Sequence, residues 1–179
     1  MTEPQWLRGP AIASRARRKV CFSSGGTECA AWFYPGTNGG CVIMAGGFAV
    51  TKEPGTDLFA GRFNDAGFAV LAFDYRCFGW ALNAESYPDW RREVAARSAL
   101  RTGLYRPGRA APRVRCPLLV VVCDQDRSAL AEPAARAARR APRGELVRLP
   151  GGHYAPFLGA HERAVQAELT FLRQNLLAA

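Results

Sequence analysis

The stretch FAVLAFDYR, residues 68–76, decides the fold of this chain. It begins with an unbroken apolar run, which lacks the polar alternation of a half-exposed strand. Such a run is typical of a strand that is buried on both faces of a parallel sheet. The polar segment DYRCFGW, residues 74–80, overlaps its end. Because ligands bind at the carboxyl ends of strands in open α/β sheets, this segment predicts part of a site.

The sequence around this strand alternates between strand and helix patterns. A hairpin is expected around Gly25-Gly26, since paired glycines favour tight turns. Strands alternating with helices predict an α/β layered fold with a mainly parallel sheet. The further strands are expected at 41–47, 118–126 and 144–152, and the helices at 57–68, 87–106, 130–142 and 161–177.

Length and composition favour a single domain over residues 19–179, after a basic and partly flexible segment at 1–18. The chain has 179 residues, of which 49% are hydrophobic, so it is long enough to bury a core. The net charge of +9 is spread over helical stretches without a recognised nucleic-acid motif, and a solvated arginine-rich surface is therefore favoured. No apolar run suits a membrane span or a secretory signal, so we expect a cytoplasmic protein without nucleic-acid or membrane partners.

No metal or cofactor is expected from the motifs. The six cysteines include no C-x-x-C pair, and the two histidines have no cluster of ligands around them. The sequence contains neither G-x-G-x-x-G nor a P-loop. We therefore expect a small-molecule substrate, which protein side chains convert without a metal or cofactor.

Four polar clusters at strand ends, taken in order, resemble the α/β-hydrolase family, in its branch of bacterial esterase- and peptidase-like members. The clusters are AGGFAVTKE (45–53), DYRCFGW (74–80), CDQDR (123–127) and GGHY (151–154). The resemblance implies a compact α/β-hydrolase-like three-layer sandwich without a cap domain, built on a mainly parallel sheet of about six strands.

The resemblance also assigns roles to individual residues. His153 corresponds to the catalytic base, and Asp126 to the acid that fixes the tautomer of its imidazole. Backbone amides after the third strand correspond to an oxyanion hole, and aromatic side chains in these loops correspond to an apolar pocket. The residues expected in the oxyanion hole and the pocket are Gly47, Phe48, Phe78, Trp80 and Tyr154.

One large part of the family pattern is absent from the sequence. Residues 81–117, between the second cluster and the strand expected at 118–126, contain no G-x-S-x-G, G-x-C-x-G or G-x-D-x-G nucleophile elbow. The chain therefore resembles a minimised hydrolase whose central unit is excised. The identity of the nucleophile is therefore left open, with three candidates. These are Cys77, whose thiolate a nearby imidazole would stabilise, Asp126, which would form an ester intermediate, and an activated water.

The other polar residues near these loops are expected to be structural. His161, at the start of the last helix, is predicted to be a solvated surface residue. Asp124 is predicted to be a loop acid, and Asp74 and Arg76 to form an ion pair beneath the site.

Two classes of function follow. The first is an enzyme with a His153–Asp126 dyad, which either hydrolyses a small apolar ester, thioester or lactone, or performs non-hydrolytic acid/base chemistry. Cyclisation, dehydration or isomerisation in natural-product biosynthesis would be of this second kind. The other class is a catalytically dead, hydrolase-like binding protein. Because excision of the central unit would expose apolar surface, a homodimer is also expected.

Overall fold

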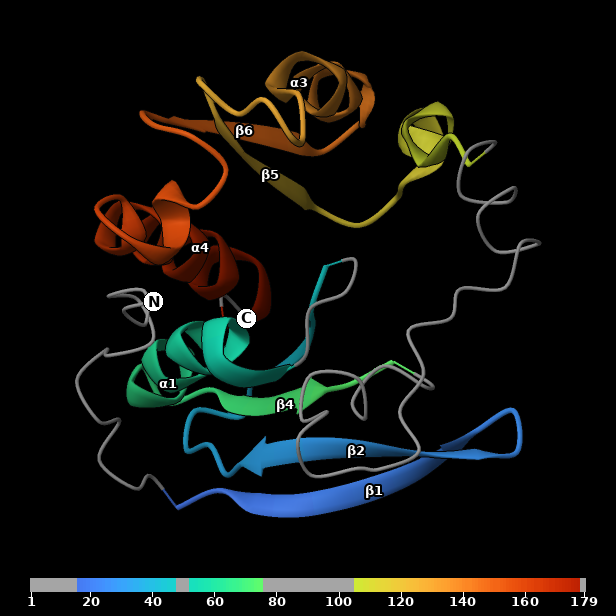
Figure 1. Cartoon of the computed structure of the whole chain (residues 1–179), viewed down its shortest axis with the longest axis vertical. Coiled ribbons are helices and arrows are strands. Elements are labelled where there is room, and N and C mark those ends of the chain that lie inside the picture. The colour runs from blue at the N-terminus through green and yellow to red at the C-terminus, as the bar shows by residue number, and fades with distance from the viewer. Residues whose placement is uncertain (1–15, 48–51, 76–104, 178–179) are drawn as a thin grey trace, which may run out of the picture. The chain divides into compact units, whose positions relative to one another are not determined.

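The computed structural model describes residues 16–47, 52–75 and 105–177. The chain divides into two compact units between Arg92 and Glu93. The described part of the first unit holds a four-stranded sheet, and that of the second holds a pair of strands (Figure 1).

A tight hairpin opens the first unit. Strands β1 (Arg18–Ser24) and β2 (Thr27–Tyr34) pair antiparallel on either side of Gly25 and Gly26. Both glycines have positive φ angles, 56° and 79°, which a two-residue hairpin turn requires and which glycine adopts without steric cost. The predicted initial hairpin is therefore confirmed.

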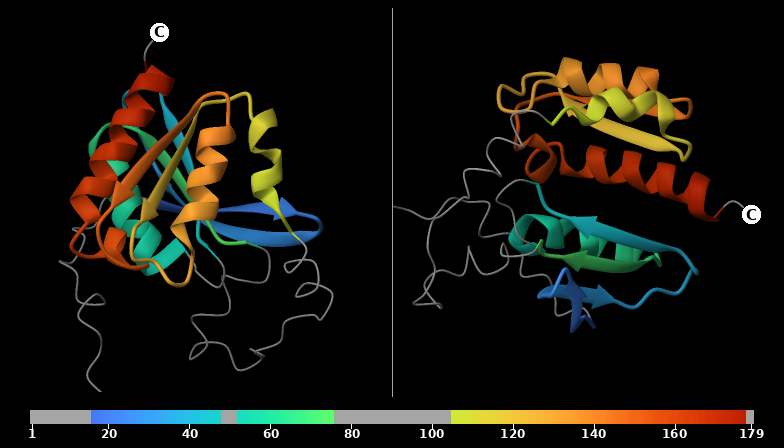
Figure 2. Two further views of the ribbon diagram at one scale, coloured as in Figure 1. Left: turned by 90° about the horizontal axis from the view of Figure 1, so that it is seen from above. Right: turned by 90° about the vertical axis from the view of Figure 1, so that its right-hand side faces the viewer.

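The remaining strands of the first unit form a parallel pair beside β2. The sheet order is β1-β2-β4-β3, in which β3 (Cys41–Ala45) runs parallel to β4 (Ala69–Phe73). The connection between them contains η2 (Lys52–Thr56) and α1 (Asp57–Asp65), and α1 lies against one face of the sheet (Figures 1 and 2).

The strand that decided the fold is present, but its burial differs from the expectation. Val70 and Ala72 are buried, while the residues between and beside them are half-buried. One of these, Phe73, packs its ring edge-on against Phe22 and Tyr75. An apolar run does not show whether both faces of a strand are fully buried or whether aromatic side chains cover one face only in part.

The second unit is a strand–helix–strand unit with parallel strands. Strand β5 (Leu118–Cys123) pairs with β6 (Gly144–Leu149) over its whole length. Helices α3 (Ala131–Arg140) and α4 (His161–Leu172) contact both strands and lie on opposite faces of the pair (Figures 1 and 2). The shorter helical segments are η4 (Pro107–Arg113), η5 (Ala155–Phe157) and η6 (Arg173–Leu177).

The predicted sheet is observed in part. The described residues contain six strands, but four of them form a mixed sheet and two form a separate parallel pair. Strand β2 is antiparallel to both of its neighbours. For β1 this follows from the two-residue turn, which joins antiparallel strands. The helix expected at 87–106 lies largely outside the described residues. Within the described ranges, the structure contains no helix with the length and apolar character of a membrane span.

Helix α4 carries one carboxyl group on its packed side. Ala164, Val165 and Leu169 are buried, and Glu168 is half-buried next to them along the helix. Burial raises the pKa of the Glu168 carboxyl from 4.5 to about 7. The neutral form is therefore favoured in the folded protein, because desolvation penalises the charged form.

We expect this group to make stability depend on pH. Its folded pKa is raised, so its contribution is fully present below pH 4.5 and is lost as the pH rises through about 7. Replacing Glu168 by Gln should raise the free energy of unfolding at pH 8 by about 2 kcal/mol, a figure discounted for partial solvation. Urea unfolding at pH 5 and pH 8 measures this effect, with Glu145→Gln, an exposed position on β6, as the control. Parallel pH curves for Glu168→Gln and the unmodified protein would contradict the prediction.

Candidate functional site

The candidate site lies where β5 and β6 end. Because the two strands are parallel neighbours, the segments that follow them leave the sheet at the same edge. The amide of Asp124 donates to the carbonyl of Leu149 at 3.0 Å, and that of Gln125 donates to Gly151 at 3.0 Å. These bonds continue the pairing beyond the strands and bring the two loops together.

His153 and Asp126 meet between these loops. Nδ1 of His153 lies 2.8 Å from Oδ2 of Asp126. The other carboxylate oxygen accepts the backbone N–H groups of Ser128 at 2.7 Å and Ala129 at 2.8 Å. Since an ionised carboxylate only accepts, Nδ1 carries the hydrogen, and Nε2 of the neutral ring holds the lone pair.

The surroundings of Asp126 favour its ionised form. The backbone N–H of Ala129, followed by the hydrogen bond to His153, lowers the pKa of the Asp126 carboxyl below its ordinary value. The Asp126 side chain is 8% exposed, whereas that of His153 is 42% exposed. A fixed negative charge thus lies beneath an accessible imidazole, an arrangement that can stabilise a protonated ring.

A glycine makes the turn before His153 possible. Gly151 has a φ of 103°, a conformation that side chains disfavour. A Cβ atom at this position would also lie 2.8 Å from the Cβ of Ala155. The glycine therefore allows the loop to close tightly against η5.

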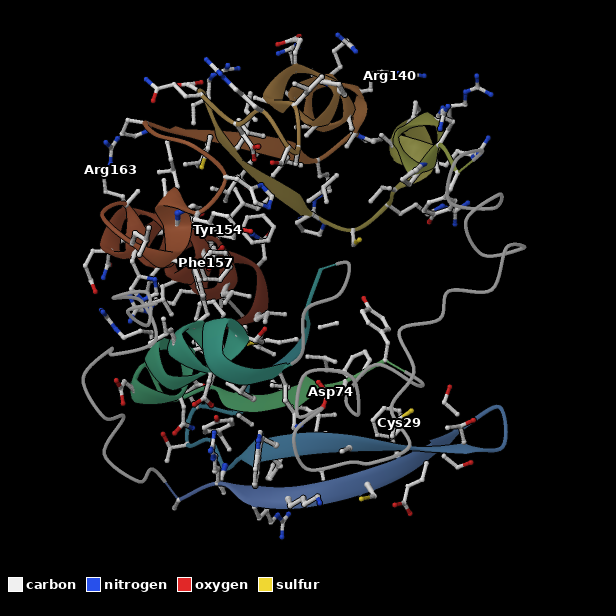
Figure 3. All side chains as sticks on the ribbon, viewed as in Figure 1. Cys29, Asp74, Arg140, Tyr154, Phe157 and Arg163 are labelled. Carbon is white, nitrogen blue, oxygen red and sulfur yellow. The ribbon has the colours of Figure 1, made fainter. Side chains whose placement is uncertain are left out.

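The two loops that carry the pair also hold apolar side chains. Tyr154 packs its ring edge-on against the imidazole of His153, with 5.0 Å between ring centroids. Tyr154 and Phe157 extend from the loop that leads into α4 (Figure 3). The large exposed apolar residues of these two loops are Leu130, Tyr154, Phe157 and Leu158.

Cys123, the last residue of β5, has little nucleophilic character. Its thiol is buried, and the residue is one of five free cysteines among the described residues. Burial, followed by the charges of Asp126 and Asp124, raises the pKa of the Cys123 thiol. It therefore remains a thiol, whereas nucleophilic attack requires a thiolate.

The structure brings together some of the predicted site residues and leaves others undescribed. His153, Asp126 and Tyr154 lie together, as expected for one site. Gly47 lies in the first unit, where it is exposed just after β3. The predicted residues Phe48, Cys77, Phe78 and Trp80 lie outside the described residues.

Asp74 has a described partner that the sequence analysis did not anticipate. Its carboxylate accepts the backbone N–H of Lys52 at 2.7 Å and contacts the ammonium group of Lys52 at 2.5 Å. The two side chains are 2% and 14% exposed, respectively. Arg76, the expected partner, lies outside the described residues. The signal for Lys52 was its place in the first polar cluster, 45–53, at a strand end.

His161 also differs from its expected role. Its Nδ1 atom lies 2.9 Å from the carbonyl oxygen of Pro156, so it is not simply a solvated residue. Nothing in the local spacing indicated this contact, because it depends on how the loop folds back. Within the ranges that the structure covers, no group of three or more His, Cys, Asp or Glu side chains could hold a metal ion.

A parallel strand unit with a His–Asp pair at its carboxyl edge is the arrangement found in hydrolases of the α/β class. A family model described as "Alpha/beta hydrolase family" matches residues 8–167. The chain therefore belongs to the alpha/beta hydrolase family, and its fold is of that type.

One curated relative and several solved structures are similar to this chain. Quorum-quenching protein AidA of Acinetobacter baumannii (strain MDR-ZJ06) is 37% identical over 82 residues, or 45% of this chain and 27% of AidA. The match thus spans only about a quarter of that relative.

Solved structures share the fold at low sequence identity. DcsB in complex with its substrate analogue has a TM-score of 0.75 at 14% identity, covering 92% of this chain and 100% of that one. Est1E from Butyrivibrio proteoclasticus with ferulic acid bound has a TM-score of 0.68 at 13% identity, covering 88% and 99%. The Pyrococcus furiosus esterase Pf2001 has a TM-score of 0.68 at 13% identity, covering 93% and 95%.

Proposed function

We propose that this protein hydrolyses a small apolar ester, thioester or lactone, with His153 and Asp126 as its acid/base pair. The observation that carries the proposal is the 2.8 Å contact between Nδ1 of His153 and a carboxylate whose other oxygen is held by two backbone amides. This contact leaves Nε2 as the basic atom on an accessible ring.

In the proposed reaction, Nε2 of His153 removes a proton from the attacking group as that group bonds to the substrate carbonyl carbon. The tetrahedral intermediate then collapses, the bond to the leaving oxygen or sulfur breaks, and His153 returns its proton to the leaving group. Asp126 remains ionised and stabilises the imidazolium that forms between these two steps.

Activated water is the attacking group that best fits the described residues. Asp126 has both carboxylate oxygens engaged, by His153 and by the Ser128 and Ala129 amides, which leaves it poorly placed for attack. Among the residues that the structure describes, no hydroxyl or thiol is bonded to Nε2 of His153. Attack by water in this way needs no intermediate that is covalently bound to the protein.

Apolar substrates are favoured by the exposed apolar side chains of the two loops that carry the pair. Tyr154, Phe157, Leu158 and Leu130 offer apolar contact area to an acyl chain or ring, which would be desolvated on binding. One structural neighbour, Pf2001 of Pyrococcus furiosus, is named as an esterase, which favours hydrolysis over other chemistry. Because no nucleophile is bonded to His153 among the described residues, non-hydrolytic acid/base chemistry remains the second candidate.

An ester-hydrolysis series tests the proposal. The purified protein is assayed with p-nitrophenyl esters of increasing chain length, an acyl thioester and a lactone. We expect turnover to favour apolar acyl groups, and His153→Asn to lower kcat/KM by at least about 100-fold. Arg163→Ala, on the exposed side of α4, is the control and should retain activity. Equal activity in the His153→Asn variant, or no turnover of any substrate in the series, would overturn the proposal.

A further inference from the structure

We propose that His161 is a positioning residue, which holds the loop carrying His153 in the shape that aims its imidazole. The expected effect on catalysis rests on the proposed function. The restraint of the loop by His161 rests on geometry alone. His161 begins α4, and the loop at 150–160 joins it to the end of β6.

The loop between β6 and α4 is folded into successive turns. The amide of Ala155 donates to Gly152 at 2.9 Å, and that of Phe157 donates to Tyr154 at 3.0 Å. The amide of Ala160 then reaches back to the carbonyl of Ala155 at 2.9 Å. The backbone of this loop therefore behaves as one connected unit, and a contact at one point affects the rest.

The side chain of His161 supplies a further hydrogen bond within this unit. Its Nδ1 atom lies 2.9 Å from the carbonyl oxygen of Pro156, in the middle of η5. A carbonyl oxygen only accepts, so Nδ1 of His161 must carry the hydrogen and donate it. The imidazole thus ties the centre of η5 to the first turn of α4.

Helix α4 is a firm support for this tether. Its residues Ala164, Val165 and Leu169 are buried, and the helix contacts both β5 and β6. His161 therefore connects the loop that carries His153 to a packed helix. A side-chain bond of this kind restricts the conformations that the loop can adopt.

His153 needs such support because its own contacts are few. Its side chain is 42% exposed, its polar partner is Asp126, and its ring neighbour Tyr154 belongs to the same loop. A site must hold its reacting groups to within about 0.5 Å, and groups on loops are held less firmly than those on helices or strands. The tether at Pro156 lies only a few residues from His153, so losing it should loosen the imidazole.

Three substitutions at one position separate the tether from general packing. His161→Asn places an amide nitrogen near the position of Nδ1 and can still donate to Pro156. His161→Gln places its amide nitrogen near the position of Nε2 and cannot donate to Pro156 in the same geometry. His161→Ala removes the side chain. The positioning role therefore predicts that the Asn variant keeps the hydrogen bond to Pro156 and the orientation of His153, and that the Ala and Gln variants lose both.

Two readouts follow the structure without requiring activity. We expect hydrogen exchange at the amides of Phe157 and Ala160 to accelerate about tenfold in the Ala and Gln variants, and to stay near the original rate in the Asn variant. In nitrogen-15 spectra, the signal of the His153 Nδ1 proton bound to Asp126 should broaden or vanish in the Ala and Gln variants and persist in Asn. The third readout is ester hydrolysis, where kcat should fall about tenfold with KM changed less than about twofold.

The outcomes distinguish the two proposals. Unchanged exchange in His161→Ala, or a His153 signal that persists in all three variants, overturns the inference whatever the activity. Faster exchange with unchanged kcat also overturns it, because the tether would then be structural only. The unmodified protein could hydrolyse no ester while His161→Asn, alone among the three variants, keeps the exchange rates and the His153 signal. In that case the proposed function fails, but the positioning of His153 by His161 stands.

Discussion

Asp126→Asn lowers kcat/KM for ester hydrolysis about 10²- to 10⁴-fold in the proposed mechanism. The backbone amides of Ser128 and Ala129 both donate to one oxygen of this side chain. They attract the single oxygen of an asparagine, which turns its NH₂ group toward Nδ1 of His153. Nδ1 must then accept, the ring proton moves to Nε2, and the basic lone pair is lost from the exposed side.

A matched control lies in the same loop. Asp124 also follows β5, but its carboxylate pairs with Arg148 at 2.7 Å, and both side chains are exposed. Asp124→Asn should therefore change kcat/KM by less than about twofold, since exposed ion pairs contribute little. Steady-state kinetics on the best ester of the series compares the two variants. Equal losses in both, or full activity in Asp126→Asn, would show that Asp126 does not set the tautomer of His153.

The ion pair in the first unit should have the largest effect on stability. Lys52→Met leaves the carboxylate of Asp74, 2% exposed, with the Lys52 backbone N–H but without its cation. We expect the free energy of unfolding to fall by about 3–5 kcal/mol, because one uncompensated charge remains buried. The double variant Lys52→Met/Asp74→Asn removes both charges and keeps an acceptor for the backbone N–H, so it should recover most of that loss.

Urea titration followed by circular dichroism measures these differences. Lys19→Met is the matched control, since Lys19 is exposed on β1 and its substitution should cost less than about 0.5 kcal/mol. A loss in Lys52→Met no larger than that of Lys19→Met would contradict the prediction. So would a double variant that is as unstable as the single one, because the cost would then not arise from an unpaired charge.

The sequence predicted most of the described secondary structure because its signals are local. The valine-rich run at 118–123 and the glycine pair at 25–26 each specify a strand or a turn through nearest neighbours. The approach of His153 to Asp126 was also predictable, since both follow parallel strands and such strands end at one edge.

Other features could not be predicted from local patterns. The pairing of Lys52 with Asp74 joins residues that are 22 positions apart, and several charged residues were equally plausible partners on paper. The bond from His161 to Pro156 depends on the path of a loop that periodicity does not describe. The burial of β4 depends on how completely each face is covered. The roles of Phe48, Cys77, Phe78 and Trp80, the homodimer and the cytoplasmic location stay predictions.

The buried thiol of Cys123 gives the chain a reporter of its own motion. Cys123 ends β5 directly before the segment that holds Asp126, and a thiol reagent can reach it only when that edge opens. Cys116 lies exposed just before the same strand and should react without any opening of the structure. The ratio of the two labelling rates therefore measures how often the sheet edge beside the His153–Asp126 pair opens transiently. Ligands that bind at this edge should slow the labelling of Cys123 and leave that of Cys116 unchanged.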